Sequence, residues 1–161
     1  MLPGPKLQQD VFDVLLRFRS NPVALVADLT DMFSQVTMAK QDRRYHRFLW
    51  RGLDLSRPPE VYEAMRLMFG DRASPYLAQY VVRQHVEDNR DDYSPAVAII
   101  LSQMYMGENM TSLETDDEVI KARDQLRELL GKAGFKIRRW CNDSAHRWLS
   151  WLSTGLSRGR S

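Results

Sequence analysis

The sequence predicts an α+β fold, in which helices pack on one face of a mainly antiparallel sheet. Two observations lead to this prediction. Segments of strand-like composition alternate along the chain with segments of helical periodicity, and several short strands precede the second helix. The 161 residues are 43% hydrophobic and contain no internal repeat, which suits one domain with a substantial core.

The first helix and the first strand are predicted close to the N-terminus. Residues 7–19 carry apolar side chains at helical spacing, and Asn21-Pro22 ends this helix. The next run, residues 23–27, is continuously apolar and lies between a helix breaker and an acidic residue. Such a run is typical of a strand that is buried on both faces, and we expect one here.

Short strands are predicted in the following part of the chain. Residues 45–51 are rich in aromatic side chains and favour a strand, which a turn at residues 52–59 follows. Residues 33–38 and 61–67 are also predicted to form short strands.

The remaining helices have clear start signals. Ser74 is predicted to cap a helix that has Pro75 at its first position and ends near Asn89. Residues 95–106 are apolar enough for a helix that leads directly into a strand. Thr115 begins a capping-box pattern, which predicts a helix to about residue 132.

The C-terminal part is basic. Gly134 ends the last long helix, and residues 135–140 alternate between apolar and basic, as expected for a half-exposed strand. From Lys132 onward the chain has seven basic residues and one acidic residue, so this end suits either a phosphate backbone or contact with solvent. We expect residues 143–161 to form a separate Ser/Gly/Arg-containing tail, partly disordered apart from a short amphipathic turn.

Composition argues against several classes of site. Cys141 is the single cysteine, which excludes an intramolecular disulfide and a cysteine-based zinc site. The three histidines lie far apart in the sequence without ligand-like spacing. The longest apolar run, residues 96–101, is too short to span a bilayer, and no signal peptide precedes the first helix. We therefore expect an intracellular protein, cytoplasmic or nuclear, without a membrane partner.

Asp28 is the first candidate functional residue. It follows the apolar run directly, and a short aspartate at the end of a rigid strand is the kind of hard oxygen ligand that Mg²⁺ requires. The alternative is that Asp28 or Asp31 caps a short helix at residues 29–33. The local sequence by itself favours the capping interpretation.

Five motifs in a characteristic order change that balance. From about residue 2 to residue 142 the chain resembles reverse transcriptases, most closely those of BEL/Pao-type LTR retrotransposons. The segments that carry the resemblance are Pro3-Gly4-Pro5-Lys6-Leu7-Gln8, Ala27-Asp28-Leu29-Thr30-Asp31-Met32-Phe33, Phe69-Gly70-Asp71-Arg72-Ala73-Ser74-Pro75-Tyr76-Leu77-Ala78, Tyr105 to Ser112 and Gly131 to Asn142, with Asp42 to Trp50 as a further family-like segment.

The resemblance implies a polymerase palm over residues 1–142, with incomplete fingers and no thumb. The activity implied is RNA-directed DNA synthesis by two-metal nucleotidyl transfer with Mg²⁺ or Mn²⁺. The implied partners are an RNA or DNA template-primer and deoxynucleotide triphosphates. The missing subdomains would come from a larger polyprotein.

The resemblance also assigns roles to individual residues. Asp28 would bind both metal ions, and Phe33 would lie under the sugar and exclude a 2′-hydroxyl. The other nucleotide-site candidates surround the base and the primer end; they are Gly70, Ser74, Pro75, Tyr105 and Met106. Each has an ordinary structural alternative, because Phe33, Tyr105 and Met106 also suit a core, and Gly70 to Pro75 also suits a turn before a capped helix.

The chain departs from the family at Gly107 and Glu108, where the family has two aspartates. Gly107 has no side chain, and the extra methylene of Glu108 moves its carboxylate by about 1.5 Å. Asp28 and Glu108 remain as catalytic and metal-binding candidates, but we expect metal binding to be impaired and polymerase activity to be weak or lost.

A non-catalytic role is the alternative. The cations Lys136, Arg138 and Arg139, together with Trp140, offer charge and a stacking surface to a single nucleic-acid strand. An exposed edge strand that basic residues protect from aggregation is the simpler explanation of the same cluster. A relic that binds nucleic acid or protein, and a fragment without a selected function, therefore both stay open.

Overall fold

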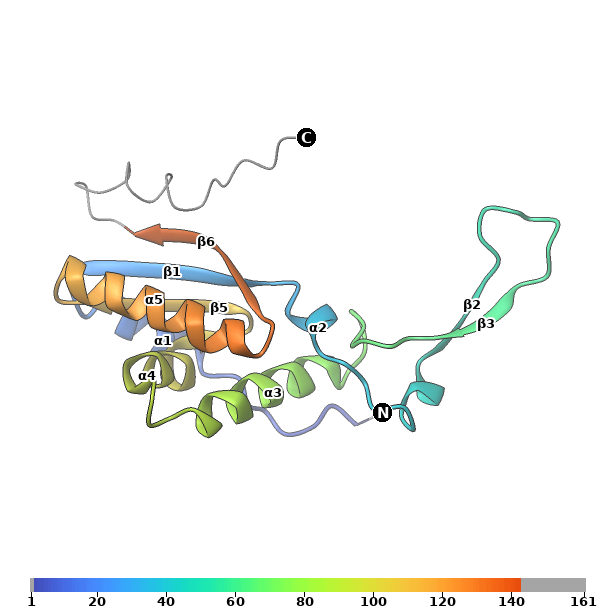
Figure 1. The fold of residues 1–161 in the computed structure, drawn as a ribbon, viewed down its shortest axis with the longest axis horizontal. Helices are drawn as coiled ribbons and strands as arrows, with labels where there is room; N and C mark the ends of the chain where they lie inside the picture. Colours follow the sequence, from blue (N-terminus) through green and yellow to red (C-terminus); the bar gives the residue numbers. More distant parts are fainter. Residues whose placement is uncertain (1, 143–161) are drawn as a thin grey trace.

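The computed structural model describes residues 2–142, so the predicted tail lies outside the described residues. Its main sheet has four antiparallel strands in the order β4-β5-β1-β6 (Figure 1). The strands are β1 (Val23–Thr30), β4 (Met104–Tyr105), β5 (Glu108–Leu113) and β6 (Lys136–Asn142).

Helices cover one face of this sheet, as the sequence predicted. They are α3 (Ser74–Asp88), α4 (Ser94–Gln103) and α5 (Asp116–Lys132), which lie on the same side of the strands in Figure 1. Their buried side chains form one core with the inward-facing side chains of β1. The fold class is thus α+β with an antiparallel sheet, and no helix within residues 2–142 is long and apolar enough to cross a membrane.

The prediction that the first strand is buried on both faces was wrong. Along β1, Leu25, Ala27 and Leu29 are buried, whereas the residues between them are only partly buried. Alternating side chains point to opposite faces of a sheet, so one face of β1 meets the helices and the other is open. We call the face of the sheet that points away from the helices the open face. Asp28 belongs to it.

Two further predictions of secondary structure were wrong. Residues 33–38 do not form a strand, because α2 (Met32–Gln35) follows β1 and only Thr37 makes a bridge, to Arg66. The first helix, α1 (Val11–Phe18), begins later than predicted, where the Asp10 carboxylate accepts a hydrogen bond from the Phe12 amide at 2.8 Å. The segment before it, residues 2–10, has no regular secondary structure, and its Leu7 carbonyl accepts a hydrogen bond from Arg83.

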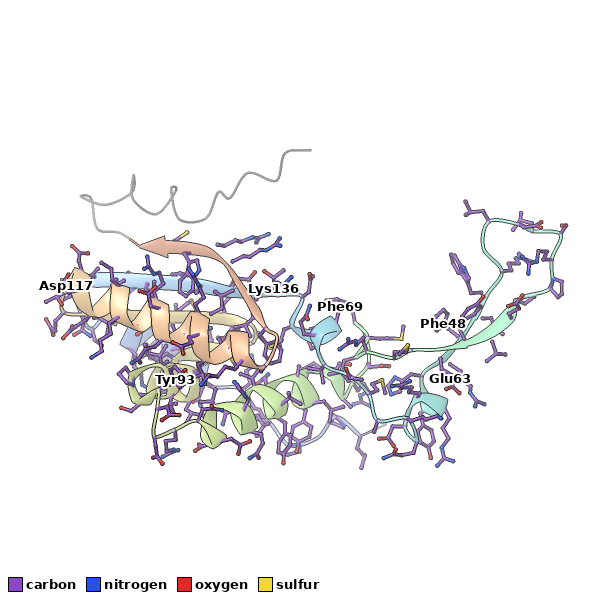
Figure 2. The ribbon with its side chains drawn as sticks, viewed as in Figure 1. Phe48, Glu63, Phe69, Tyr93, Asp117 and Lys136 are labelled. Atoms are coloured by element: carbon purple, nitrogen blue, oxygen red, sulfur yellow. The ribbon has the colours of Figure 1, made fainter. Side chains whose placement is uncertain are left out.

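A separate hairpin projects from the body of the molecule. It consists of β2 (Arg47–Trp50) and β3 (Glu60–Glu63), which follow the 3-10 helix η1 (Arg43–Tyr45), and every residue of its two strands is exposed. Figure 2 shows Phe48 and Glu63 on this hairpin, far from Tyr93 and Asp117 in the helical layer. The strand predicted at 61–67 is shorter than expected, since β3 ends at Glu63.

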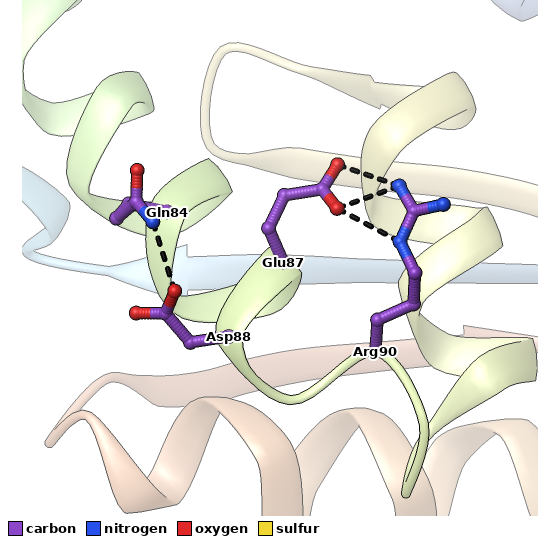
Figure 3. Close-up of polar contacts among 4 residues, drawn as sticks. All are labelled: Gln84, Glu87, Asp88 and Arg90. Atoms are coloured by element: carbon purple, nitrogen blue, oxygen red, sulfur yellow. Dashed lines mark hydrogen bonds and ion pairs between the residues drawn. The ribbon is translucent and has the colours of Figure 1, made fainter.

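Helix α3 begins one residue earlier than predicted, because Ala73 holds the N-cap position and Ser74 is already helical. At its other end the chain leaves the helix at Asn89, as predicted. Figure 3 shows the polar contacts there, in which Arg90 binds both oxygens of Glu87 and Gln84 donates to Asp88. These exposed contacts add little stability, so α3 depends on its buried face.

The last helix and strand agree closely with the sequence. Thr115 and Glu118 form the predicted capping box of α5, and Gly134 follows the helix with a φ of 80°. Strand β6 then runs along the edge of the sheet beside β1. Its alternation is interrupted by a bulge, where Arg139 has a φ of 55°.

Candidate active site

Four side chains form one row across the open face. Strand pairing aligns Tyr105 with Glu108, Glu108 with Asp28, and Asp28 with Arg138. Directly opposed residues of antiparallel strands project to the same face, with Cβ atoms about 4.5–5.5 Å apart. The structure therefore brings the two predicted catalytic carboxylates, Asp28 and Glu108, side by side, and Asp28 is an ordinary strand residue rather than a helix cap.

A tight turn lies at the end of this row. Met106 and Gly107 connect β4 to β5, and the Gly107 carbonyl accepts a hydrogen bond from the Leu29 amide at 2.8 Å. The left-handed backbone, with a φ of 57°, falls on Met106 and not on the glycine. Gly107 is thus not required by the conformation of the turn. Gln79 of α3 supports the turn through a long contact to the Met106 sulfur, 3.9 Å.

A side chain would fit at Gly107. An added Cβ atom would lie 3.7 Å from the Leu29 carbonyl oxygen and 3.9 Å from the Asp28 Oδ1, which are ordinary van der Waals distances. An aspartate here would extend from a position next to the Asp28 carboxylate. The fold therefore does not require glycine at position 107.

The donor atoms present do not fit a two-metal site. No group of three or more His, Cys, Asp or Glu side chains within residues 2–142 is placed to hold a metal ion, so Asp28 and Glu108 form only a pair. Glu114 follows the far end of β5, about 20 Å from Glu108 at the usual rise of a strand. The acidic start of α5 comes after it and is equally remote.

The other nucleotide-site candidates differ in exposure, from the buried Ser74 to the exposed Gly70. Phe33, on α2, is partly buried and packs edge-on against Phe69, with ring centroids 4.9 Å apart. Ser74 is 2% exposed, and its hydroxyl has no hydrogen-bond partner among the described residues. Pro75 borders a cavity between α3 and the N-terminal segment, and Gly70 has a φ of 91° in the loop before α3.

The predicted nucleic-acid-binding cluster is divided between the two faces. Lys136 and Arg138 are exposed and, by register, share the open face with Thr30 and Asp28. Trp140 instead packs partly buried against the core. The bulge at Arg139 causes this division, since it adds one residue to β6 and turns Trp140 towards the helices.

Sequence reasoning missed one buried ionisable contact. His46 is 7% exposed, and its Nδ1 lies 2.6 Å from the Asp71 Oδ2. This contact joins the base of the β2–β3 hairpin to the loop before α3. The two residues are 25 positions apart in the sequence, so no local pattern indicated their pairing.

A comparison with protein families gives a match over this region. The family model described as reverse transcriptase (RNA-dependent DNA polymerase) matches residues 2–139, which include the whole open-face row.

Proposed function

Because this chain belongs to the reverse transcriptase family, we propose that it is a retroelement palm, of BEL/Pao type, whose RNA-directed DNA synthesis is weak or lost. The family as a whole binds a nucleic-acid template and deoxynucleotide triphosphates and uses divalent metal ions. The one observation that carries the proposal is the pairing of Asp28 with Glu108 beside the empty position at Gly107.

The surviving residues would support substrate binding better than chemistry. Nucleotidyl transfer needs two cations about 3.5–4 Å apart, and several carboxylate oxygens must hold them. Asp28 offers a carboxylate on a strand paired on both sides, and Tyr105 lies next to Glu108 in the same row. With one carboxylate missing and one lengthened, this arrangement is short of metal ligands.

We expect the purified chain to show no template-dependent primer extension with Mg²⁺ or Mn²⁺. The assay uses a labelled primer on an RNA template, with Asp28→Ala as the matched variant. Extension by the unmodified chain that Asp28→Ala abolishes would disprove the loss of activity and would confirm the site. Extension that persists in Asp28→Ala would point to a contaminating polymerase.

Binding of single-stranded nucleic acid is the second candidate function. It is favoured by the exposed cations of β6, which lie on or beside the uncovered face of the sheet. The β2–β3 hairpin has exposed apolar side chains, which would suit contact with another protein surface. We propose that this surface belongs to a subdomain of a larger polyprotein, in the cytoplasm or the nucleus.

The salt dependence of binding tests this second function. Each phosphate contact should contribute about −0.7 to the slope of log affinity against log salt concentration. We expect the double variant Lys136→Gln with Arg139→Gln to make the slope shallower by about 1.4. Arg127→Gln, on α5 on the helical side of the sheet, should leave it unchanged. A slope near zero for the unmodified chain would exclude phosphate contacts.

A further inference from the structure

We propose that Arg138 stands beside Asp28 in place of a metal ion and lowers the affinity of the Asp28–Glu108 pair for divalent cations. This inference rests on the proposed function, because it concerns the same pair of carboxylates. Two observations support it. Asp28 and Glu108 are too few ligands for a two-metal site, and strand β6 places the Arg138 cation in the same row as these carboxylates.

The position of Arg138 is determined by strand pairing. Arg138 is the β6 partner of Asp28, as Glu108 is its β5 partner, so the guanidinium and the two carboxylates project from the same face. No helix of residues 2–142 covers the open face at this point, and Arg138 is exposed. No ion pair joins Arg138 to either carboxylate in the described part of the chain, so its charge acts through space.

The strand cannot easily turn Arg138 away. On one side of it Ile137, and beyond the bulge Trp140, both pack against the core. Side chains alternate between the two faces along a strand. Because Ile137 and Trp140 pack on the covered face, Arg138 must project from the open face. The bulge at Arg139 makes this possible, because without the extra residue Trp140 would face the same way as Arg138.

The two negative charges of the carboxylate pair are matched by two positive charges on β6, so the site has no net negative charge to attract a cation. Asp28 and Glu108 are opposed by Arg138 and by Lys136, which lies two positions along the same face opposite Thr30. The positive charge of the Arg138 guanidinium repels a cation that approaches the two carboxylates. At about 6 Å, one unit charge changes the affinity for a divalent ion by about tenfold in water, and by about threefold after screening by physiological salt.

The test measures Mn²⁺ binding directly, by the loss of the free-ion electron paramagnetic resonance signal. We expect Arg138→Gln to bind Mn²⁺ about three- to tenfold more tightly than the unmodified chain. Arg138→Lys keeps the charge and should match the unmodified chain, and Arg127→Gln on α5 should match it too. The gain in Arg138→Gln should shrink as the salt concentration rises.

The controls separate this inference from the proposed function. Asp28→Asn, alone and combined with Arg138→Gln, should remove the binding. If Asp28→Asn lowers affinity but Arg138→Gln equals Arg138→Lys, the role of Arg138 is overturned and the carboxylate site stands. If Asp28→Asn changes nothing, the site itself is wrong. The same series in a Gly107→Asp background gives the comparison where the unmodified chain binds too weakly to measure.

Discussion

Replacing Gly107 and Glu108 by aspartate is expected to raise the Mn²⁺ affinity of the open-face site by about 10- to 100-fold or more. Changes next to metal ligands commonly have effects of that size, and restoring a direct ligand should have at least as large an effect. The Cβ position at Gly107 is free, 3.9 Å from the Asp28 Oδ1, and its backbone does not require glycine. The affinity can be measured by calorimetry or by paramagnetic resonance.

The single variants show which change matters. Gly107→Asp adds a carboxylate and should account for most of the gain, whereas Glu108→Asp only shortens one. Glu114→Asp, beyond the far end of β5, is the matched control and should leave the affinity unchanged. An equal gain in the control, or no gain in the double variant while the fold is intact, would contradict a metal site built around Asp28.

Asn109→Val is expected to stabilise the fold by about 1–2 kcal/mol, although it changes a residue in the centre of the molecule. Asn109 is 1% exposed, and neither its side-chain nitrogen nor its oxygen has a hydrogen-bond partner among residues 2–142. A buried polar group without a partner costs about 1–3 kcal/mol, and a β-branched residue suits a strand. The free energy of unfolding in urea measures the effect.

Ser112 provides the matched control on the same strand. It is also buried, at 3% exposed, but its hydroxyl accepts from the Asn21 amide at 3.1 Å and donates to the Arg17 carbonyl at 3.0 Å. Ser112→Ala should therefore destabilise the fold by about 1–3 kcal/mol. If Asn109→Val also destabilises it, a buried water or a close contact satisfies Asn109.

The sequence predicted Asp28 and Glu108 as one pair of candidate residues. The apolar run before Asp28 predicted a strand, which continues beyond Asp28 to Thr30, and the segment from Tyr105 to Ser112 supplied Glu108. Strand pairing confirms that Asp28 and Glu108 face each other. The nucleotide-site roles stay predictions for Phe33, Gly70, Ser74 and Pro75. Ser74 is buried, which argues against direct contact between its side chain and a nucleotide.

Local patterns failed where distant contacts decide the structure. Residues 33–38 have strand-like composition, but α2 forms there because the chain must turn away from the end of β1. The contact between His46 and Asp71 joins segments that no local pattern relates. The β2–β3 hairpin keeps its aromatic residues exposed, against the usual tendency of such side chains to be buried.

The sequence by itself determined the class of fold, the start of α5 at its capping box, and the presence of Gly107 and Glu108 where the resembled family has two aspartates. These depend on backbone preferences and on side-chain chemistry, which are local. Only the tertiary structure decided which face of β1 is open and which cation stands beside Asp28. Both depend on strand register, and one bulge residue at Arg139 is enough to send Trp140 to one face while Arg138 stays on the other.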